Sequence, residues 1–328
     1  MRSVRSRTFF LLAAGLGDLE SESLVERRLM YSQAFHYRRA ATLAEASRWL
    51  AEDDGARAIA GGQSLVPLMK LRLASPSLLV DLGSIPGLNV IRAANGSICL
   101  GPMARHAEIA RSELAGRIPL LRDCAAGIAD VQVRNMGTIG GSVAEADPSG
   151  DWPTALLALN TEVRCSSPAG DRAMPLAEFI TDAFTTALAP GELVSELIVR
   201  APGGGHGSAY TAFKRTAPVY ATVNTAVALQ VDPAGRCQEA RIVLGCIALR
   251  PLRARGAEAI LTGQALSEST VAAAATAAAD AAEPPADTRG STEYKRLLIR
   301  ALVLRSLRAA WARSRGEHAE ISHEYAAR

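Results

Sequence analysis

Two pairs of adjacent glycines, each with polar neighbours, are the residues whose types and spacing indicate a chemical role. Gly61-Gly62 is followed by Gln63-Ser64, and Gly140-Gly141 stands between Thr138 and Ser142. A glycine has no Cβ atom, so paired glycines let backbone N–H groups approach an anionic group such as a diphosphate. The polar neighbours add side-chain donors beside those amides. At this level the pairs predict a phosphate-binding site, although the alternative that each is only a chain-reversing turn is equally good.

The sequence lacks the motifs of independent catalytic sites. It has no Walker-type lysine loop, no Gly-x-Ser-x-Gly elbow and no His-Glu-x-x-His pair. The Gly-x-Gly-x-x-Gly motif is also missing, which counts against a Rossmann domain. The histidines are isolated, which favours surface or turn positions over metal ligation for His36, His106 and His206, and His318 and His323 fall in a polar C-terminal tail. We therefore expect neither a catalytic side chain nor a metal site on this chain.

Composition sets the class of protein. The chain has 328 residues, 48% of them hydrophobic, and a net charge of +3, which predicts a sizeable core and more than one domain. Its basic residues are scattered among acids, which argues against a nucleic-acid partner. The dispersed cysteines fit reduced, buried thiols in a cytoplasmic protein, and they are Cys99, Cys124, Cys165, Cys237 and Cys246. No ferredoxin-type spacing occurs, so any iron–sulfur cluster must lie on another chain.

The first 29 residues differ from the rest. Arg2, Arg5 and Arg7 precede the apolar run Phe9–Leu16, which is too short to span a bilayer. We interpret residues 1–29 as a flexible extension, or as the result of an upstream start codon with the working start at Met30; a secretory signal is the less favoured alternative. No other segment approaches membrane length, so stable membrane insertion is not expected.

The next segment, residues 30–84, predicts a first subdomain. Thr42 and Glu45 have the spacing of a capping box at the start of a helix. A strand at Ala56–Ala60, a helix at Leu65–Leu73 and a strand at Leu78–Leu82 then form a β-loop-α-β unit. The first glycine pair lies in the loop of this unit.

Residues 85–202 predict a second subdomain, and residues 203–313 a C-terminal domain. The glycine-rich run from Pro202 to Gly207 is the boundary. Turn signals predict hairpins around Asn95-Gly96 and Pro168–Asp171, and helical spacing predicts the helices Arg105–Leu114, Pro119–Ala129 and Asp151–Leu159. The C-terminal domain is expected to contain the strands Ala209–Arg215, Thr222–Val231 and Ala240–Leu249 and the helices Ser267–Ala282 and Ser291–Arg313. Residues 314–328 are expected to form a frayed polar tail.

Longer motifs around the glycine pairs resemble a known family. Ala60–Leu65 is followed by Leu68-Met69-Lys70-Leu71-Arg72, and Val133–Gly141 is followed by Ala146-Asp147-Pro148 and Asp151. With Val80-Asp81-Leu82, these runs closely resemble the FAD-binding (medium) subunit of molybdenum hydroxylases of the carbon monoxide dehydrogenase and xanthine dehydrogenase type. The resemblance covers residues 30–313 and excludes the N-terminal extension.

The resemblance implies an α+β fold of the vanillyl-alcohol-oxidase (PCMH-like) type. Two α+β subdomains would hold FAD between them, and a small C-terminal domain with a three-stranded antiparallel sheet and helices would pack alongside. The residues that it implies around the diphosphate and its sugars are Ala58, Ile59, Ala60, Gly61, Gly62, Gln63, Ser64, Leu65, Thr138, Ile139, Gly140, Gly141 and Ser142.

Five further positions match cofactor contacts of the family. Ile128 matches an apolar contact, and Leu193 a further contact. Asp151 matches an acid that binds ribose or ribityl hydroxyls; its alternative role is a helix cap. Lys214 matches a basic residue near the flavin, and Tyr220 an aromatic that covers the isoalloxazine face, with an ordinary strand-edge aromatic as the alternative.

Three positions depart from the family pattern. Gln63 stands where histidine is frequent, and Glu145 where histidine or a small residue is frequent. Ala217-Pro218-Val219 replaces a more polar sequence before Tyr220. The last difference leaves the assignment of Tyr220 and the identity of the electron acceptor open.

The function implied by the resemblance is electron relay. FAD on this chain would accept electrons from two [2Fe–2S] clusters of a small subunit and pass them to an external acceptor. A large subunit would oxidise the substrate at a molybdopterin centre, in a dimer of heterotrimers. The alternatives are a self-sufficient FAD oxidase, which would need its own substrate pocket and base, and a non-enzymatic assembly subunit that retains the fold.

Overall fold

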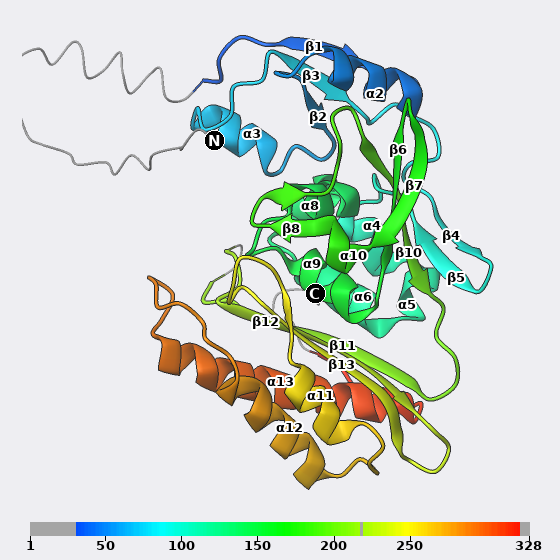
Figure 1. Cartoon of the computed structure of the whole chain (residues 1–328), viewed down its shortest axis with the longest axis vertical. Coiled ribbons are helices and arrows are strands. Elements are labelled where there is room, and N and C mark those ends of the chain that lie inside the picture. The colour runs from blue at the N-terminus through cyan, green and yellow to red at the C-terminus, as the bar shows by residue number, and fades with distance from the viewer. Residues whose placement is uncertain (1–30, 217–218, 322–328) are drawn as a thin grey trace, which may run out of the picture.

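The three larger sheets of the described chain follow one another along the long axis of the molecule (Figure 1). The computed structural model describes residues 31–216 and 219–321, so the interpretation of residues 1–29 lies outside the described part of the chain. Within it, no helix is long and apolar enough to cross a membrane. The mixed α and β composition confirms the predicted fold class.

The first sheet is small and parallel. Its order is β1 (His36–Arg39), β3 (Leu78–Asp81) and β2 (Arg57–Ile59), with helices α2 (Leu43–Glu52) and α3 (Leu65–Lys70) in the connections. Thr42 caps α2 as predicted by accepting from the N–H of Glu45, but the Glu45 carboxylate accepts from the N–H of Ala41 and not of Thr42, so the reciprocal bond of a capping box is not formed. The β-loop-α-β unit is confirmed. Strand β1 escaped prediction because all four of its residues are exposed and show no apolar alternation.

The second sheet has five antiparallel strands. Its order is β4 (Ile91–Ala94), β5 (Ser97–Leu100), β10 (Leu193–Arg200), β6 (Glu162–Ser167) and β7 (Gly170–Pro175). Both predicted hairpins are present, as β4–β5 and β6–β7. The central strand β10 was not predicted, and it joins the hairpins through long-range pairing that local sequence does not encode.

Short helices pack on this sheet. They are α4 (His106–Arg111), α5 (Glu113–Gly116), α6 (Pro119–Gly127), α7 (Val131–Met136), α8 (Ile139–Glu145), α9 (Asp151–Ala158) and α10 (Leu176–Phe179), and a two-stranded ribbon of β8 (Ile180–Asp182) and β9 (Thr185–Thr186) follows α10. The single helix expected over Arg105–Leu114 is divided, because Ser112 ends α4 and caps α5 through the N–H of Ala115.

The C-terminal sheet has four strands, not the three that were predicted. Its order is β11 (His206–Phe213), β12 (Val223–Val231), β13 (Cys237–Gly245) and β14 (Leu252–Arg253). The fourth strand is two residues long and pairs only with Val243 and Leu244, so no periodic pattern marked it. One face of the sheet packs against α6 and α9, and the other against α11 (Arg255–Leu261) and α13 (Thr292–Ser314), with α12 (Glu268–Asp280) packed on these two helices (Figure 1).

The expectation of a frayed tail is wrong for residues 314–321. The guanidinium of Arg313 donates two hydrogen bonds to the Ala319 carbonyl, and Ile321 is buried in the C-terminal core. Arg313 also pairs with Asp123 of α6, which ties the end of α13 to the second subdomain. Ile321 lies seven positions beyond the end of α13. A single apolar residue at that distance is too weak a local signal to predict that the tail folds back onto the core.

The contact between β11 and α13 generates a stability prediction. A Cβ added at Gly207 would lie 1.8 Å from the carbonyl oxygen of Ala310. We expect Gly207→Ala to lower the free energy of unfolding by at least about 2 kcal/mol, because the strand or helix must move. The matched control is Gly256→Ala in α11, where the Cβ would meet nothing within 4 Å. Urea unfolding that shows equal losses for both variants would contradict this packing.

Candidate functional site

A cleft of about 910 Å³ lies where the first and second subdomains and the C-terminal domain meet. It is lined by Ala58, Ile59, Ala60, Gly61, Gly62, Gln63, Ser64, Leu65, Ile128, Thr138, Gly140, Gly141, Ser142, Asp151, Leu193, Lys214 and Tyr220. Of the predicted site residues, Ile139 alone is not in the lining, because its side chain is fully buried in the core behind α8. The fold thus brings segments that are far apart in sequence to one cavity.

The first glycine pair forms one end of the cleft. The last residue of β2 is Ile59, whose carbonyl accepts a hydrogen bond from the N–H of Leu82. Three residues later, Gly62 has a left-handed backbone conformation with φ +70°. In the described part of the chain, the N–H groups of residues 61–64 donate no hydrogen bond to the protein. Four consecutive free amides beside a cavity are suited to an anionic ligand.

The second glycine pair is not in a loop, which corrects the sequence interpretation. Gly140 and Gly141 lie in the first turn of α8, which Thr138 caps by accepting from the N–H of Gly141 at 3.2 Å. The N–H of Gly140 donates to the Pro102 carbonyl at 2.8 Å, and the N–H of Ile139 to the Ala104 carbonyl at 3.0 Å. These amides are therefore already used, so the free backbone donors come from the first pair.

The glycines of both pairs permit a close approach of backbones. A Cβ on Gly61 would lie 2.3 Å from the Met136 carbonyl oxygen, and one on Gly140 would lie 2.4 Å from the Pro102 side chain. Neither position tolerates a larger residue without movement of the surrounding chain. Gly61 thus sets the distance between the two subdomains, and Gly140 sets how closely α8 packs on the Pro102 segment within the second subdomain.

A buried charged cluster forms another part of the lining. The Tyr210 hydroxyl donates to Oδ1 of Asp151, and Nζ of Lys214 lies 3.5 Å from the same oxygen. Lys214 also donates to the Gly127 carbonyl at 2.6 Å, next to Ile128. Burial and the Asp151 charge raise the pKa of Tyr210 well above its usual range, so Tyr210 remains a donor.

Two expectations about this cluster change. The cap of α9 is Gly150 and Asp151 is the first residue of the helix, so the alternative role of Asp151 as the cap is wrong. Tyr210 was not singled out from the sequence. The available signal was the spacing between Tyr210 on β11 and Lys214 just after it. The two residues are four positions apart, and alternate residues of a strand share a face.

Tyr220 stands at the exposed part of the cleft. It follows residues 217–218, which lie outside the described part of the chain, and belongs to the link between β11 and β12, so it is not a strand residue. Partial burial and the charge of Asp147 raise its pKa. Glu145 lines the same region, and burial together with Asp147 raises the pKa of its carboxyl.

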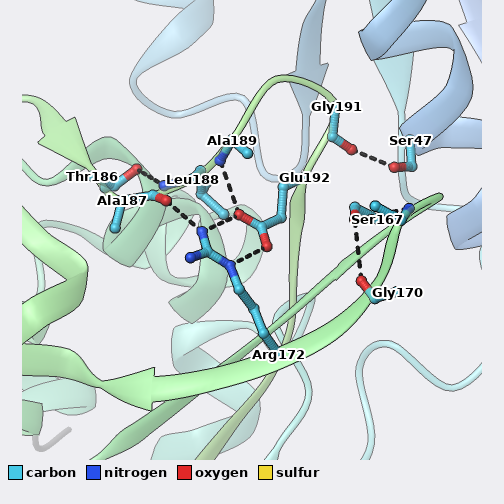
Figure 2. A network of polar contacts seen from close by, with 11 residues as sticks. Ser47, Ser167, Gly170, Arg172, Thr186, Ala187, Leu188, Ala189, Gly191 and Glu192 are labelled. Atoms are coloured by element: carbon cyan, nitrogen blue, oxygen red, sulfur yellow. Dashed lines mark hydrogen bonds and ion pairs between the residues drawn. The ribbon is translucent and has the colours of Figure 1, made fainter.

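Residues 186–194 form a wall of the cleft, and an ion pair anchors them (Figure 2). The guanidinium of Arg172 donates to both carboxylate oxygens of Glu192 at 2.6 Å and to the Ala187 carbonyl. Glu192 also accepts from the N–H of Ala189. Ser47 of α2 donates to the Gly191 carbonyl, so the wall is fixed to the first subdomain as well.

His106 is a lining residue that sequence reasoning placed elsewhere. It was expected on the surface or in a turn, but it is 5% exposed and accepts a hydrogen bond from Trp152. The five cysteines are free thiols, and burial raises the pKa of Cys124 and Cys165, so these two remain protonated. Within the described residues, no three His, Cys, Asp or Glu side chains gather as a metal site.

The anchored wall generates a pH-dependent prediction. Hydrogen bonding from Arg172 lowers the pKa of Glu192 below its ordinary value of 4.5, so the pair stabilises the fold above about pH 4.5 and this contribution is lost as the pH falls. We expect Arg172→Met to lower the melting temperature by several degrees at pH 7 and by progressively less as the pH falls below 4.5 and through the lowered pKa of Glu192.

The control for this prediction is Arg308→Met. Arg308 pairs with Glu268 across two exposed side chains, and such pairs contribute little to stability. A melting temperature of Arg172→Met that equals that of the control at pH 7 would show that the ion pair does not hold the wall.

Comparisons with known proteins identify the family. Residues 33–201 match the family model of the FAD-binding domain in molybdopterin dehydrogenase, and residues 208–310 match the CO dehydrogenase flavoprotein C-terminal domain. The chain is 39% identical to the 6-hydroxypseudooxynicotine dehydrogenase complex subunit alpha of Paenarthrobacter nicotinovorans, over 90% of this chain and 100% of that one.

Carbon monoxide dehydrogenases are similar in both sequence and structure. The medium chain from Afipia carboxidovorans is 36% identical over 87% of this chain and 100% of its own. A solved carbon monoxide dehydrogenase chain from Hydrogenophaga pseudoflava superimposes with a TM-score of 0.83 at 37% identity, covering 87% of this chain and 99% of that one. The chain therefore belongs to the FAD-binding medium subunits of the molybdenum hydroxylase family, as an oxidoreductase subunit whose cofactor is FAD.

Proposed function

We propose that this subunit relays electrons through FAD held in the cleft. The electrons come from [2Fe–2S] clusters on a small partner subunit and leave to an external acceptor, and a large partner subunit oxidises the substrate at a molybdopterin centre. One observation carries the proposal: a single cavity joins four free backbone amides to a buried lysine–carboxylate pair. This arrangement suits an elongated ligand with a diphosphate and a redox ring, and the volume of about 910 Å³ is that of a substantial ligand site.

The chain's residues divide into two groups in this proposal. Residues 58–65 and 138–142 hold the diphosphate and its sugars, with the amides of 61–64 as backbone donors. Asp151 accepts from cofactor hydroxyls through the oxygen that Tyr210 leaves open, while Ile128 and Leu193 provide apolar contacts. Lys214 places a positive charge near the flavin. When bound, FAD supplies the redox chemistry, and the protein supplies position and charge.

Membership of the family supports the proposed partner subunits. The relatives are described as a medium chain and as a subunit of a complex, which supports an assembly of different chains. We place the molybdopterin and the clusters on those partners, in a dimer of heterotrimers in the cytoplasm, where five free thiols fit a reducing environment. The substrate is then selected by the large subunit.

The chain's division into functional units is also a proposal. Residues 30–84 and 85–202 form the two FAD-binding subdomains, and residues 203–313 form the C-terminal domain. The support is an apolar core centred on the first subdomain, to which Ile85, Leu88 and Leu193 of the second subdomain contribute, and a C-terminal core beneath β11–β13, while the middle core is shared across the sheet.

Lys214 gives the most direct test of the flavin end. We expect Lys214→Met to lower the midpoint reduction potential of bound FAD, because a positive charge near the ring stabilises its reduced anionic form. Lys214→Arg keeps the charge and should stay close to the wild type. Spectroelectrochemical titration of the purified, FAD-loaded chain makes the measurement. Equal potentials in the wild type and Lys214→Met would remove Lys214 from the flavin site.

The relay itself is tested on the complex purified through a tag on this chain. We expect molybdenum, iron and FAD in the preparation, and bleaching of the flavin absorbance by the substrate only when the cluster-bearing subunit is present. Reduction of FAD by an organic substrate on the isolated chain would favour a self-sufficient oxidase. A wild-type chain that carries and binds no FAD would overturn the proposal.

A further inference from the structure

His106 is fixed at the junction of the two glycine segments. It is the first residue of α4, and its backbone N–H donates to the Gly137 carbonyl at 3.1 Å. The preceding residue forms a β-bridge with Thr138, and the Ala104 carbonyl accepts from Ile139. The backbone around His106 therefore runs alongside the second glycine segment and cannot shift independently of it.

The hydrogen bond from Trp152 determines the tautomer of His106. The indole Nε1 lies 3.0 Å from Nδ1 of the imidazole, and both side chains are buried. An indole N–H can only donate, so Nδ1 must accept and the neutral ring carries its proton on Nε2. Burial, aided by the charge of Arg134, lowers the pKa of His106 to about 4, so the ring is neutral at physiological pH.

The Nε2–H group is a donor without a partner on the protein. Within the described residues Nε2 makes no hydrogen bond, although His106 is 5% exposed and lines the cleft. A Cβ on Gly137 would lie 2.7 Å from Nε2, and a Cβ on Gly61 would lie 2.7 Å from the Gly137 Cα. The donor thus lies where the first glycine loop meets the second segment.

We propose that His106 is a cofactor-binding residue whose Nε2–H donates a hydrogen bond to a diphosphate oxygen of FAD. Trp152 is the positioning residue, because its indole keeps the proton on the nitrogen nearer the glycine junction. The inference rests on the proposed FAD site and adds a side-chain donor to its backbone amides. A neutral imidazole donates to the diphosphate over the whole physiological pH range without a change in charge.

Two substitutions separate binding from structural support. His106→Leu removes both the acceptor for Trp152 and the donor to the cleft. His106→Gln keeps both functions, because a carboxamide accepts with its oxygen and donates with its nitrogen. We expect His106→Leu to weaken binding by about tenfold to a hundredfold, the effect of a hydrogen bond to a charged group, and His106→Gln to restore most of the affinity.

The measurement is calorimetric titration of the full, deflavinated chain with FAD, ADP and riboflavin. The loss in His106→Leu should be equal for FAD and ADP, which share the diphosphate, and absent for riboflavin, which has none. An equal loss for riboflavin, or no loss for ADP, would overturn the proposal. If the wild type binds no FAD, the proposed function fails; if it does and His106→Leu binds FAD equally well, only the role of His106 fails.

Nitrogen NMR of the ¹⁵N-histidine-labelled wild type provides a test that does not depend on a variant's stability. We expect the His106 signals of the Nε2–H tautomer, unchanged between about pH 5 and 8, and a shift of the Nε2 signal on addition of ADP. A protonated ring in that range, an Nδ1–H tautomer, or an Nε2 signal that does not respond to ADP would contradict the inference.

Discussion

The cleft exists because two backbones approach each other more closely than side chains would permit. Gly61 lies against the Met136 carbonyl and Gly137, and Gly140 lies against Pro102. Hydrogen bonds from Ile139 and Gly140 to the segment that precedes α4 hold the second glycine segment in place. A methyl group on Gly61 would separate the two subdomains, and one on Gly140 would displace α8 from Pro102 within the second subdomain. The glycines therefore first allow these chain segments to pack closely, and the proposed phosphate binding depends on that packing.

Charges in the cleft are neutralised by partners from distant parts of the chain. Lys214 and Tyr210 of the C-terminal domain compensate Asp151 of α9, and Arg172 compensates Glu192 in the cleft wall. Buried carboxylates without such partners would carry a large desolvation cost. Consequently the C-terminal domain, which contributes none of the glycine motifs, is required for the electrostatics of the cleft around Asp151.

Local patterns predicted the elements that are specified by neighbouring residues. The Thr42 cap of α2, the β-loop-α-β unit and the two hairpins are all encoded over short stretches, and the structure contains them. The patterns failed where partners are remote. Strand β10 pairs with strands about thirty to a hundred residues away, and β14 is too short to show periodicity. The second glycine pair was interpreted as a loop because glycine lowers helix propensity, yet Thr138 caps a helix there.

The sequence by itself determined the family and its cofactor, because the long motifs around the glycines are specific and ordered. Its predicted site residues, apart from Ile139, all line the cleft, but it missed His106 and most of the wall formed by residues 186–194. The tertiary structure determined which of these residues have hydrogen-bonding groups free to bind a ligand. The amides of residues 61–64 are free while those of Ile139 and Gly140 are occupied, and His106 became a buried donor because Trp152 binds its other nitrogen. Hydrogen-bond partners from other elements determine these properties, and a linear pattern does not specify which groups remain unpaired.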